Sequence, residues 1–511
     1  IYTVRKATQG LANFIIKENA QEKGVAIAFD SRHMSPEFAK ETALCMAANG
    51  IKAYIFPSLR PTPMLSFALR ELGCTAGVVV TASHNPPQYN GYKVYWEDGA
   101  QITAPKDKQI ITEVQAITDF AQVKTMSEED AKAAGLYEVI GEEIDDRYME
   151  ALKKLVLRPE AIKEQADKLK IVYTPLHGTG NIPVRRVLKE LGFNNVYVVK
   201  EQELPDGDFS TVSYPNPEDK NAFTLALKLA AEVDADIVLA TDPDADRLGI
   251  YAKNEKTGEY ESFTGNMSGM LILEYLLSQR KELGMLPENG AVVTTIVSGK
   301  MARAIAKEYN VALIETLTGF KYIGEQIKFF EQNHDHEFLF GYEESYGCLE
   351  GTHARDKDAV VAVMALCEAA AYYKSKGITL CEQMEKLYQK YGFYKESLFF
   401  QTFPGAEGKA KIDGLMDALR NEPPKQVGPF KVTALEDYKK SVRTDIATGE
   451  TSALTLPESN VLYFELEDGA WFCVRPSGTE PKIKYYAGVK GTDAQDAADK
   501  LEALSKAVVE L

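Results

Sequence analysis

The sequence lacks the features of several large classes of protein. Its six cysteines stand apart without metal-ligand spacing, mostly in apolar surroundings, as expected of buried thiols in a reducing compartment. No apolar run approaches the roughly 20 residues that span a bilayer, and the first residues do not resemble a signal peptide. Positive charge is in deficit, and the net charge of −17 opposes general binding to nucleic acid or anionic membranes. We therefore expect a cytoplasmic protein that binds neither.

The length and composition indicate several globular domains. A chain of 511 residues is too long for one hydrophobic core and should divide into three or four domains. Hydrophobic residues make up 45% and charged residues 26%, which is ordinary for a globular protein. The first residue, Ile1, is not methionine, so we expect further residues before it. The sequence indicates no particular oligomeric state.

A strand followed by a chemically rich loop occurs three times. The apolar segments 77–80, 235–240 and 336–340 each run into a polar loop, within a pattern of alternating strands and helices. In such sheets, ligands bind at the carboxyl ends of the strands. The last part instead has strands joined by tight turns. We predict three similar parallel or mixed α/β domains and a C-terminal α+β domain around a central cleft, with the ranges 1–160, 161–268, 269–388 and 389–511.

The first loop carries a serine where an apolar strand turns polar. The string Thr81-Ala82-Ser83-His84-Asn85-Pro86 follows the strand, and Lys93 comes shortly after. A serine in this position could be a turn residue or a helix cap. It could also be a nucleophile at the mouth of a ligand crevice.

The second loop offers three carboxylates at alternate positions. Asp242, Asp244 and Asp246 follow a strand, and such hard oxygen ligands suit Mg²⁺. A solvated acidic turn is the simpler interpretation. An EF-hand is excluded, because its sixth and twelfth positions hold Arg247 and Lys253 rather than glycine and glutamate. A transferase acting on nucleoside-diphosphate sugars could use an Asp-x-Asp pair, but would leave the serine loop without a role.

Two further loops carry groups suited to a sugar phosphate. The string Glu343-Glu344-Ser345 offers acceptors and a hydroxyl for sugar hydroxyl groups, although it is also common on solvated loops. The string 475–479, Arg-Pro-Ser-Gly-Thr, combines a guanidinium group, two hydroxyls and a glycine that lets backbone N–H groups approach a phosphate. A basic hairpin turn is the alternative.

From about Arg32 to the end, the four loops resemble those of the α-D-phosphohexomutases, the phosphoglucomutase/phosphomannomutase family, in the family's order. The resemblance is greatest to the α-phosphoglucomutase branch, since the mannose and glucosamine versions tend to carry Met or Gln in place of Glu344. It implies an enzyme that interconverts α-glucose 1-phosphate and glucose 6-phosphate. The family reaction passes through a phosphoserine and glucose 1,6-bisphosphate, which is both intermediate and activator.

The resemblance also implies a role for each site residue. The catalytic residues would be Ser83, with His84 or Lys93 as the general base. Mg²⁺ would be held by Ser83, once phosphorylated, and by Asp242, Asp244 and Asp246. The sugar-phosphate contacts would be Arg247, Thr318, Gly319, Glu343, Ser345, Lys357, Arg475, Ser477, Gly478 and Thr479.

Several alternatives remain at this point. A phosphomannomutase or a phosphopentomutase would use the same mechanism, and a non-catalytic sugar-phosphate-binding protein or a metal-dependent phosphatase would share several loops. The family also has an N-terminal glycine-rich loop with an arginine near the reacting phosphate, for which this sequence has no counterpart. We expect either that the chain given is incomplete or that the active site lacks this member.

Overall fold

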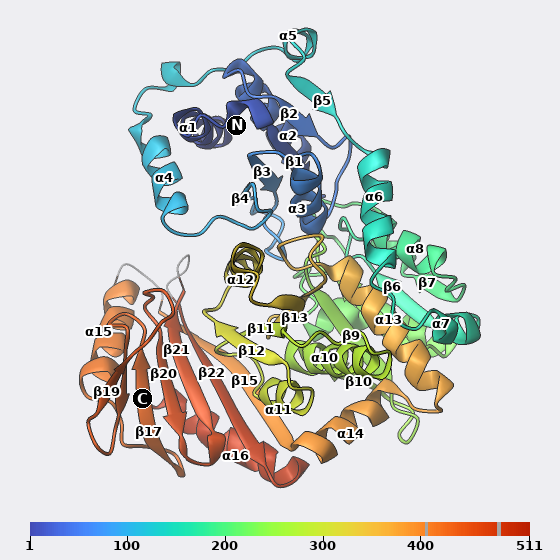
Figure 1. The fold of residues 1–511 in the computed structure, drawn as a ribbon, viewed down its shortest axis with the longest axis vertical. Helices are drawn as coiled ribbons and strands as arrows, with labels where there is room; N and C mark the ends of the chain where they lie inside the picture. Colours follow the sequence, from blue (N-terminus) through green and yellow to red (C-terminus); the bar gives the residue numbers. More distant parts are fainter. Residues whose placement is uncertain (404–406, 478–481) are drawn as a thin grey trace. The chain divides into compact units, whose positions relative to one another are not determined.

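The computed structural model describes residues 1–403, 407–477 and 482–511 (Figure 1). Contacts divide these residues into two compact units. One unit comprises Ile1–Thr294, Tyr309–Ile314 and Gly319–Gln383, and the other comprises Thr295–Glu308, Glu315–Thr318 and Met384–Leu511. The chain forms three mixed α/β sheets followed by an antiparallel sheet, which confirms the predicted fold class. The four domain ranges stay a prediction, because the contacts place most of the first three sheets in one unit.

The first sheet has the strand order β4-β3-β1-β2-β5. Its central strands are short apolar runs whose residues are all buried, as expected for strands covered on both faces. The strands are β4 (Tyr92–Trp96), β3 (Ala76–Val80), β1 (Val25–Phe29), β2 (Ala53–Ile55) and β5 (Tyr137–Val139). The helices of this region are α1 (Tyr2–Lys17), α2 (Ser35–Ala48), α3 (Thr62–Glu71), α4 (Lys106–Ala116), α5 (Glu128–Ala133) and α6 (Glu142–Lys153).

The second sheet has the order β10-β9-β8-β6-β7, in which β8, β6 and β7 are parallel. Its strands are β10 (Tyr260–Phe263), β9 (Leu248–Lys253), β8 (Ile237–Thr241), β6 (Ile171–Thr174) and β7 (Val196–Val198). The helices are α7 (Pro159–Gln165), α8 (Asn181–Glu190) and α9 (Thr224–Val233).

The third sheet has the order β12-β11-β13-β14. Its strands are β12 (Ala312–Thr316), β11 (Gly290–Thr295), β13 (Glu337–Glu343) and β14 (Gly347–Glu350). The helices are α10 (Gly265–Glu282), α11 (Met301–Glu308), α12 (Phe320–Asn333) and α13 (Ala359–Ser375). Most residues of α10 and α13 are buried, since both helices are apolar on nearly every side.

The same hairpin occurs in each of these three sheets. A strand that runs parallel to one neighbour turns back through a loop into an antiparallel strand on its other side: β3 into β4, β8 into β9, and β13 into β14. The three predicted site loops are these three turns. One expectation was wrong: Glu343 is the last residue of β13 and not a loop residue, because it pairs with Gly347 across the hairpin.

The C-terminal sheet follows the path β15-β22-β21-β20-β17-β18-β19, with β16 paired to β17. Helix α16 packs against β15 and β22 (Figure 1). The strands are β15 (Phe393–Thr402), β16 (Gln426–Val427), β17 (Phe430–Asp437), β18 (Val442–Asp445), β19 (Thr451–Ala453), β20 (Leu462–Leu466), β21 (Trp471–Pro476) and β22 (Lys482–Gly491). The helices are α14 (Leu380–Tyr391), which begins in the first unit, α15 (Gly408–Asn421) and α16 (Ala494–Val509).

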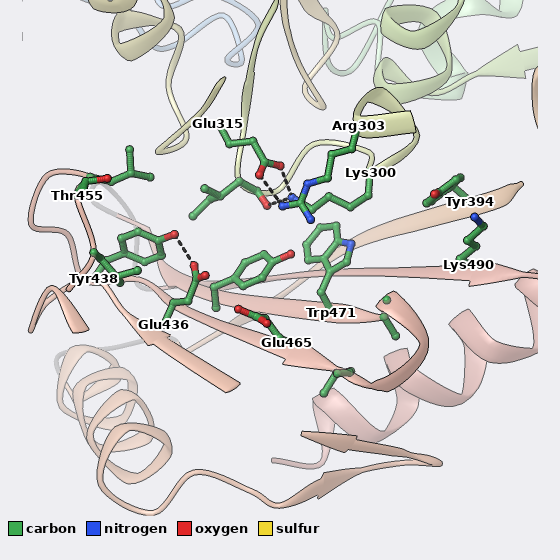
Figure 2. Close-up of a pocket in the computed structure, with 17 residues that line it drawn as sticks. Lys300, Arg303, Glu315, Tyr394, Glu436, Tyr438, Thr455, Glu465, Trp471 and Lys490 are labelled. Carbon is green, nitrogen blue, oxygen red and sulfur yellow. Dashed lines mark hydrogen bonds and ion pairs between the residues drawn. The ribbon is translucent and has the colours of Figure 1, made fainter. Parts of the chain in front are cut away.

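A cavity of about 520 Å³ is lined entirely by residues of the second unit (Figure 2). Lys300 and Arg303 both pair with Glu315 in its wall, and Tyr438 donates a hydrogen bond to Glu436. These charges are already paired with one another, and none of the predicted site residues lines the cavity. We therefore do not include it in the candidate site. Over the described ranges, none of the helices has the length and apolar character needed to cross a membrane.

Candidate active site

Ser83 lies in the turn between β3 and β4, with its hydroxyl directed at a carboxylate of the second sheet. Its backbone has a φ of 52°, in the left-handed region that non-glycine residues rarely adopt. The hydroxyl of Thr81 accepts a hydrogen bond of 2.8 Å from the Ser83 N–H. The Ser83 Oγ donates to Asp242 Oδ2 at 3.0 Å and lies 3.1 Å from His84 Nδ1. Residues 159 positions apart in the sequence are thus brought into contact.

The three predicted aspartates form a buried cluster at the carboxyl end of β8. Asp242, Asp244 and Asp246 each offer one oxygen, and these oxygens all lie within 4.8 Å of one another. The turn is tight, because Asp242 Oδ1 accepts hydrogen bonds from the N–H groups of Asp246 and Arg247, both at 3.0 Å. Gly178 supports the turn from behind, where a Cβ atom would lie 2.5 Å from the Cα of Pro243. The solvated acidic turn is therefore excluded.

Two lysines from the neighbouring sheets contact this cluster. Lys93 on β4 has its Nζ 2.8 Å from Asp244 Oδ2 and 3.5 Å from Asp246 Oδ2. Lys357, between β14 and α13, has its Nζ 3.2 Å from Asp246 Oδ2. The cluster therefore combines the aspartates that follow β8 with a lysine on β4 and a lysine from the segment between β14 and α13.

Burial and neighbouring charges shift the pKa values of Asp242 and Asp244 in opposite directions. Burial, together with the charges of Asp244 and Asp246, raises the pKa of Asp242 well above its usual range. Burial also opposes ionisation of Asp244, but the charge and hydrogen bond of Lys93 outweigh it and lower the pKa of that carboxyl. The pKa of Lys93 is raised in turn, because Asp244 and Asp246 outweigh the effect of its burial. A bound cation would favour the ionised form of Asp242.

The donor set fits a divalent metal ion. Within the described part of the chain, neither Asp244 Oδ1 nor Asp246 Oδ1 has a hydrogen-bond partner, although both oxygens are buried. Buried carboxylate oxygens normally accept hydrogen bonds or coordinate a metal. The three oxygen donors match the ligand preference of Mg²⁺.

The other predicted contacts of the first unit lie around the same turns. Glu343 is buried and its Oε1 accepts a hydrogen bond of 2.8 Å from the N–H of Gly319. Burial raises the pKa of Glu343 to about 7, an effect that the charge of Lys357 partly opposes. Arg247 pairs with Glu218, and Ser345 is half-buried in the turn after β13.

The remaining predicted residues belong to the second unit or lie outside the described residues. Thr318 is half-buried in the second unit. Arg475 is on β21, and Ser477 follows that strand, with its N–H donating to the carbonyl of Lys482 at 2.8 Å. Gly478 and Thr479 lie outside the described residues. The proposed phosphate-binding role of this loop stays a prediction.

Sequence reasoning missed two residues that hold the site together. Thr62 begins α3, and its Oγ1 donates to Asp244 Oδ2 at 2.8 Å, while its N–H donates to the Asp244 carbonyl at 3.0 Å. Arg32 contacts the loop that carries Ser83. Their only signal in the sequence was local, a helix start for Thr62 and a loop after β1 for Arg32.

Ligands bind at the carboxyl ends of strands in such α/β sheets, and a buried carboxylate cluster that can hold a divalent ion beside a serine hydroxyl is suited to transfer of a phosphoryl group. Comparison with known protein families leads to the same kind of enzyme. The chain matches the three α/β/α domains of phosphoglucomutase/phosphomannomutase over residues 1–120, 146–257 and 264–391, and the C-terminal domain of that family over residues 420–504. The chain belongs to the phosphoglucomutase/phosphomannomutase family and is an enzyme of that family.

Individual relatives match over nearly the whole chain. A phosphoglucomutase of Staphylococcus epidermidis is 40% identical over 490 residues, which cover 96% of this chain and 87% of the relative. A phosphoglucomutase of Staphylococcus aureus is 38% identical over 506 residues, covering 98% and 88% respectively. The fold is similar to that of parafusin, a phosphoglucomutase of Paramecium, with a TM-score of 0.69, 18% identity, and coverage of 99% of this chain and 90% of that one.

Proposed function

We propose that this phosphohexomutase interconverts α-glucose 1-phosphate and glucose 6-phosphate, through a phosphorylated Ser83 and glucose 1,6-bisphosphate. One observation carries the proposal: the Ser83 hydroxyl lies 3.0 Å from the first carboxylate of a buried aspartate cluster. The names of the Staphylococcus relatives support the choice of glucose.

The reaction requires two transfers at one serine. In the first, the bond from phosphorus to Ser83 Oγ breaks as a new bond forms to the oxygen of the unphosphorylated sugar hydroxyl. The proton of that hydroxyl passes to a base, for which His84 is the better candidate. Lys93, the other residue predicted for this role, is held in its charged form because Asp244 and Asp246 raise its pKa. The base gives this proton to Ser83 Oγ as the phosphoryl group leaves, and His84 Nδ1 lies 3.1 Å from that oxygen. The bisphosphate then turns round, and Ser83 Oγ attacks its other phosphoryl group while the base takes the serine proton and passes it to the oxygen of the product hydroxyl.

The metal site would consist of Asp242, Asp244 and Asp246, with the phosphoryl group on Ser83 as a further ligand. The chemistry that Mg²⁺ supplies when bound is neutralisation of charge on the transferring phosphoryl group. Lys93 and Lys357, which already contact the aspartates, would add positive charge for the same purpose.

The phosphate group that does not react needs a binding site of its own. Arg475 and Ser477, with Gly478 and Thr479 of the same loop, are the residues that the family resemblance assigns to this role. Arginine suits it because the guanidinium group can donate two parallel hydrogen bonds to a phosphate. Both isomers would present their resting phosphate to this loop.

Intact mass spectrometry after incubation with glucose 1,6-bisphosphate tests the proposal. Wild type should gain one phosphoryl group, and Ser83→Ala should gain none and lose turnover while still binding sugar phosphates. Ser278→Ala, which removes a hydroxyl on α10 that donates to the Tyr275 carbonyl, is the matched control and should behave like wild type. Turnover by Ser83→Ala would refute the phosphoserine. A non-catalytic binding protein would gain no phosphoryl group, and a phosphatase would release inorganic phosphate.

Glu343 is the residue we propose for substrate choice. Glucose and mannose differ only in the orientation of the 2-hydroxyl, and a buried acceptor left unpaired by the wrong sugar discriminates strongly. Glu343→Ala should weaken turnover of glucose 1-phosphate and narrow its preference over mannose 1-phosphate. The exposed Glu337, at the start of the same strand, provides the control variant Glu337→Ala. Catalytic efficiencies for glucose, mannose and ribose 1-phosphates decide the question, and a preference of wild type for mannose or ribose would overturn the assignment to glucose.

A further inference from the structure

Arg32 is a fully buried arginine whose guanidinium group is surrounded by the loop that carries Ser83. Its side chain is 0% exposed. Nη2 donates to the carbonyl of Ser83 at 2.6 Å and also to that of Asn85. Nη1 donates to the carbonyls of Pro86 and Tyr89 at 2.8 and 3.1 Å. One side chain thus holds four carbonyl groups within seven consecutive residues.

The guanidinium group is itself held on two sides. Asp30 Oδ2 lies 3.2 Å from Arg32 Nε, and Asp30 Oδ1 accepts a hydrogen bond of 3.0 Å from the Arg32 N–H. The same carboxylate accepts hydrogen bonds from Ser35 and Thr81, both at 2.7 Å. The ring of Phe209 covers the guanidinium group, with its centroid 5.0 Å from Arg32 Cζ. These contacts leave the group little room to move.

This arrangement has a direct consequence for Ser83. The left-handed backbone at this serine is unfavourable by itself, and such a conformation persists only where its surroundings impose it. Arg32 holds the serine's own carbonyl, and Thr81, which is tied to Asp30, accepts from its N–H. The direction of the hydroxyl toward Asp242 depends on this backbone conformation.

We infer that Arg32 is the positioning residue of the phosphoryl-transfer loop. It organises the carbonyl groups of residues 83–89 and so places the Ser83 hydroxyl at the carboxylate cluster. A guanidinium group has four Nη–H donors, and all four point to loop carbonyls. The fifth donor, the N–H of Nε, is buried 3.2 Å from Asp30 Oδ2. The Nη groups are thus used by the loop and Nε lies at Asp30, so the residue acts on the reaction through the loop and not by contact with substrate. This inference rests on the proposed function.

Only arginine has the donors that this role requires. The planar guanidinium group presents its N–H groups in a rigid fork, whereas a lysine ammonium is a single point with three donors on a flexible stem. Arg32→Lys therefore keeps the charge but leaves at least one of the four carbonyls without its donor. Displacement of a reacting group by about 1 Å can reduce a rate about 100-fold.

Arg32→Lys, compared with Arg420→Lys, tests the inference. Arg420 is a buried arginine of the C-terminal unit that pairs with Asp437, and its replacement controls for loss of a buried guanidinium group. We expect Arg32→Lys to lower kcat and the single-turnover phosphorylation of Ser83 by about 100-fold, with KM for the sugar phosphate nearly unchanged. Arg420→Lys should lower the unfolding temperature without changing either rate in the folded protein. A rate for Arg32→Lys equal to wild type, or a loss no larger than that of Arg420→Lys, would overturn the inference.

Hydrogen exchange provides a second measurement that needs no turnover. The N–H groups of Asn85 and Tyr89 donate to carbonyls within the loop, and both should exchange faster in Arg32→Lys but not in Arg420→Lys. Unchanged exchange in Arg32→Lys would contradict the role of Arg32. If wild type gains no phosphoryl group at Ser83, the proposed function fails, while the exchange result still decides whether Arg32 organises the loop. Should Arg32→Lys not fold, Asp30→Asn serves instead, because it removes the charge beside Nε. It should likewise slow the phosphorylation of Ser83 and speed the exchange of the loop N–H groups. Wild-type values of both in Asp30→Asn would overturn the inference.

Discussion

Replacement of Asp244 by asparagine should greatly weaken binding of Mg²⁺. Asp244 is fully buried, and its Oδ2 accepts hydrogen bonds from Thr62 and Lys93, both at 2.8 Å. Its Oδ1 has no hydrogen-bond partner in the described part of the chain and is available to a metal ion. Asparagine keeps the size and one oxygen, so the change removes mainly one negative charge.

The size of the effect follows from the charges that surround the site. Three aspartates face Lys93 and Lys357, so the loss of one carboxylate leaves two negative charges opposite two positive ones. Two unit charges about 4 Å apart interact by about 4 kcal/mol at an effective dielectric constant of about 20. Because Mg²⁺ carries two charges, removing the carboxylate charge costs about twice this interaction energy. The amide oxygen that remains can still coordinate the ion and recovers part of the loss. A net loss of about 4 kcal/mol corresponds to binding about 1,000-fold weaker.

Titration with Mg²⁺, followed by isothermal calorimetry on the purified protein, measures this directly. Asp234→Asn is the matched control, because it makes the same change in charge at an exposed carboxylate that pairs with Lys253. The control should bind Mg²⁺ like wild type, and Asp244→Asn should also lose most of its turnover. Equal affinity in Asp244→Asn and wild type would refute the metal assignment, as would full turnover of wild type in excess EDTA.

Two further predictions concern stability and substrate binding. Burial raises the pKa of Glu368 to about 7. The folded state therefore binds more protons than the unfolded state, and stability is lost as the pH rises from about 4.5 to 7. Glu368→Gln removes this loss of stability. By urea unfolding, the variant should be more stable than wild type by about 3 kcal/mol at pH 8 but not at pH 4. An equal difference at both pH values would contradict the raised pKa of Glu368. Arg475→Ala should weaken binding of both glucose phosphates by about 2–4 kcal/mol, and the exposed Lys431→Ala by much less. Weaker binding of only one of the two glucose phosphates would contradict the proposal that both bind their non-reacting phosphate at this loop.

Local patterns in the sequence were sufficient to predict site residues where the motif is continuous in the chain. The three aspartates stand at alternate positions after a strand, so a single turn brings their oxygens together whatever surrounds it. The position of Ser83 was predictable for a similar reason, since an apolar strand ends immediately before it. The strands β1, β3 and β8 were recognisable because each is a short, fully buried run of apolar residues.

Pairing between strands was less predictable. The third predicted loop began too early, because Glu343 belongs to β13. Whether a polar residue at the end of a strand continues the ladder depends on the strand that returns beside it, here β14. Strand ends are set by a partner and not by local composition.

The sequence by itself therefore determined the fold class, the family and the residues that could carry chemistry. Only the tertiary structure decided which of them meet. Thr62 and Lys93 reach Asp244 from 182 and 151 residues away, and Arg32 reaches the Ser83 carbonyl from 51 residues away. The physical reason is that these contacts arise where separate sheets pack together and bury charge. Burial then forces each charge to find a partner, and no local pattern specifies which partner that will be.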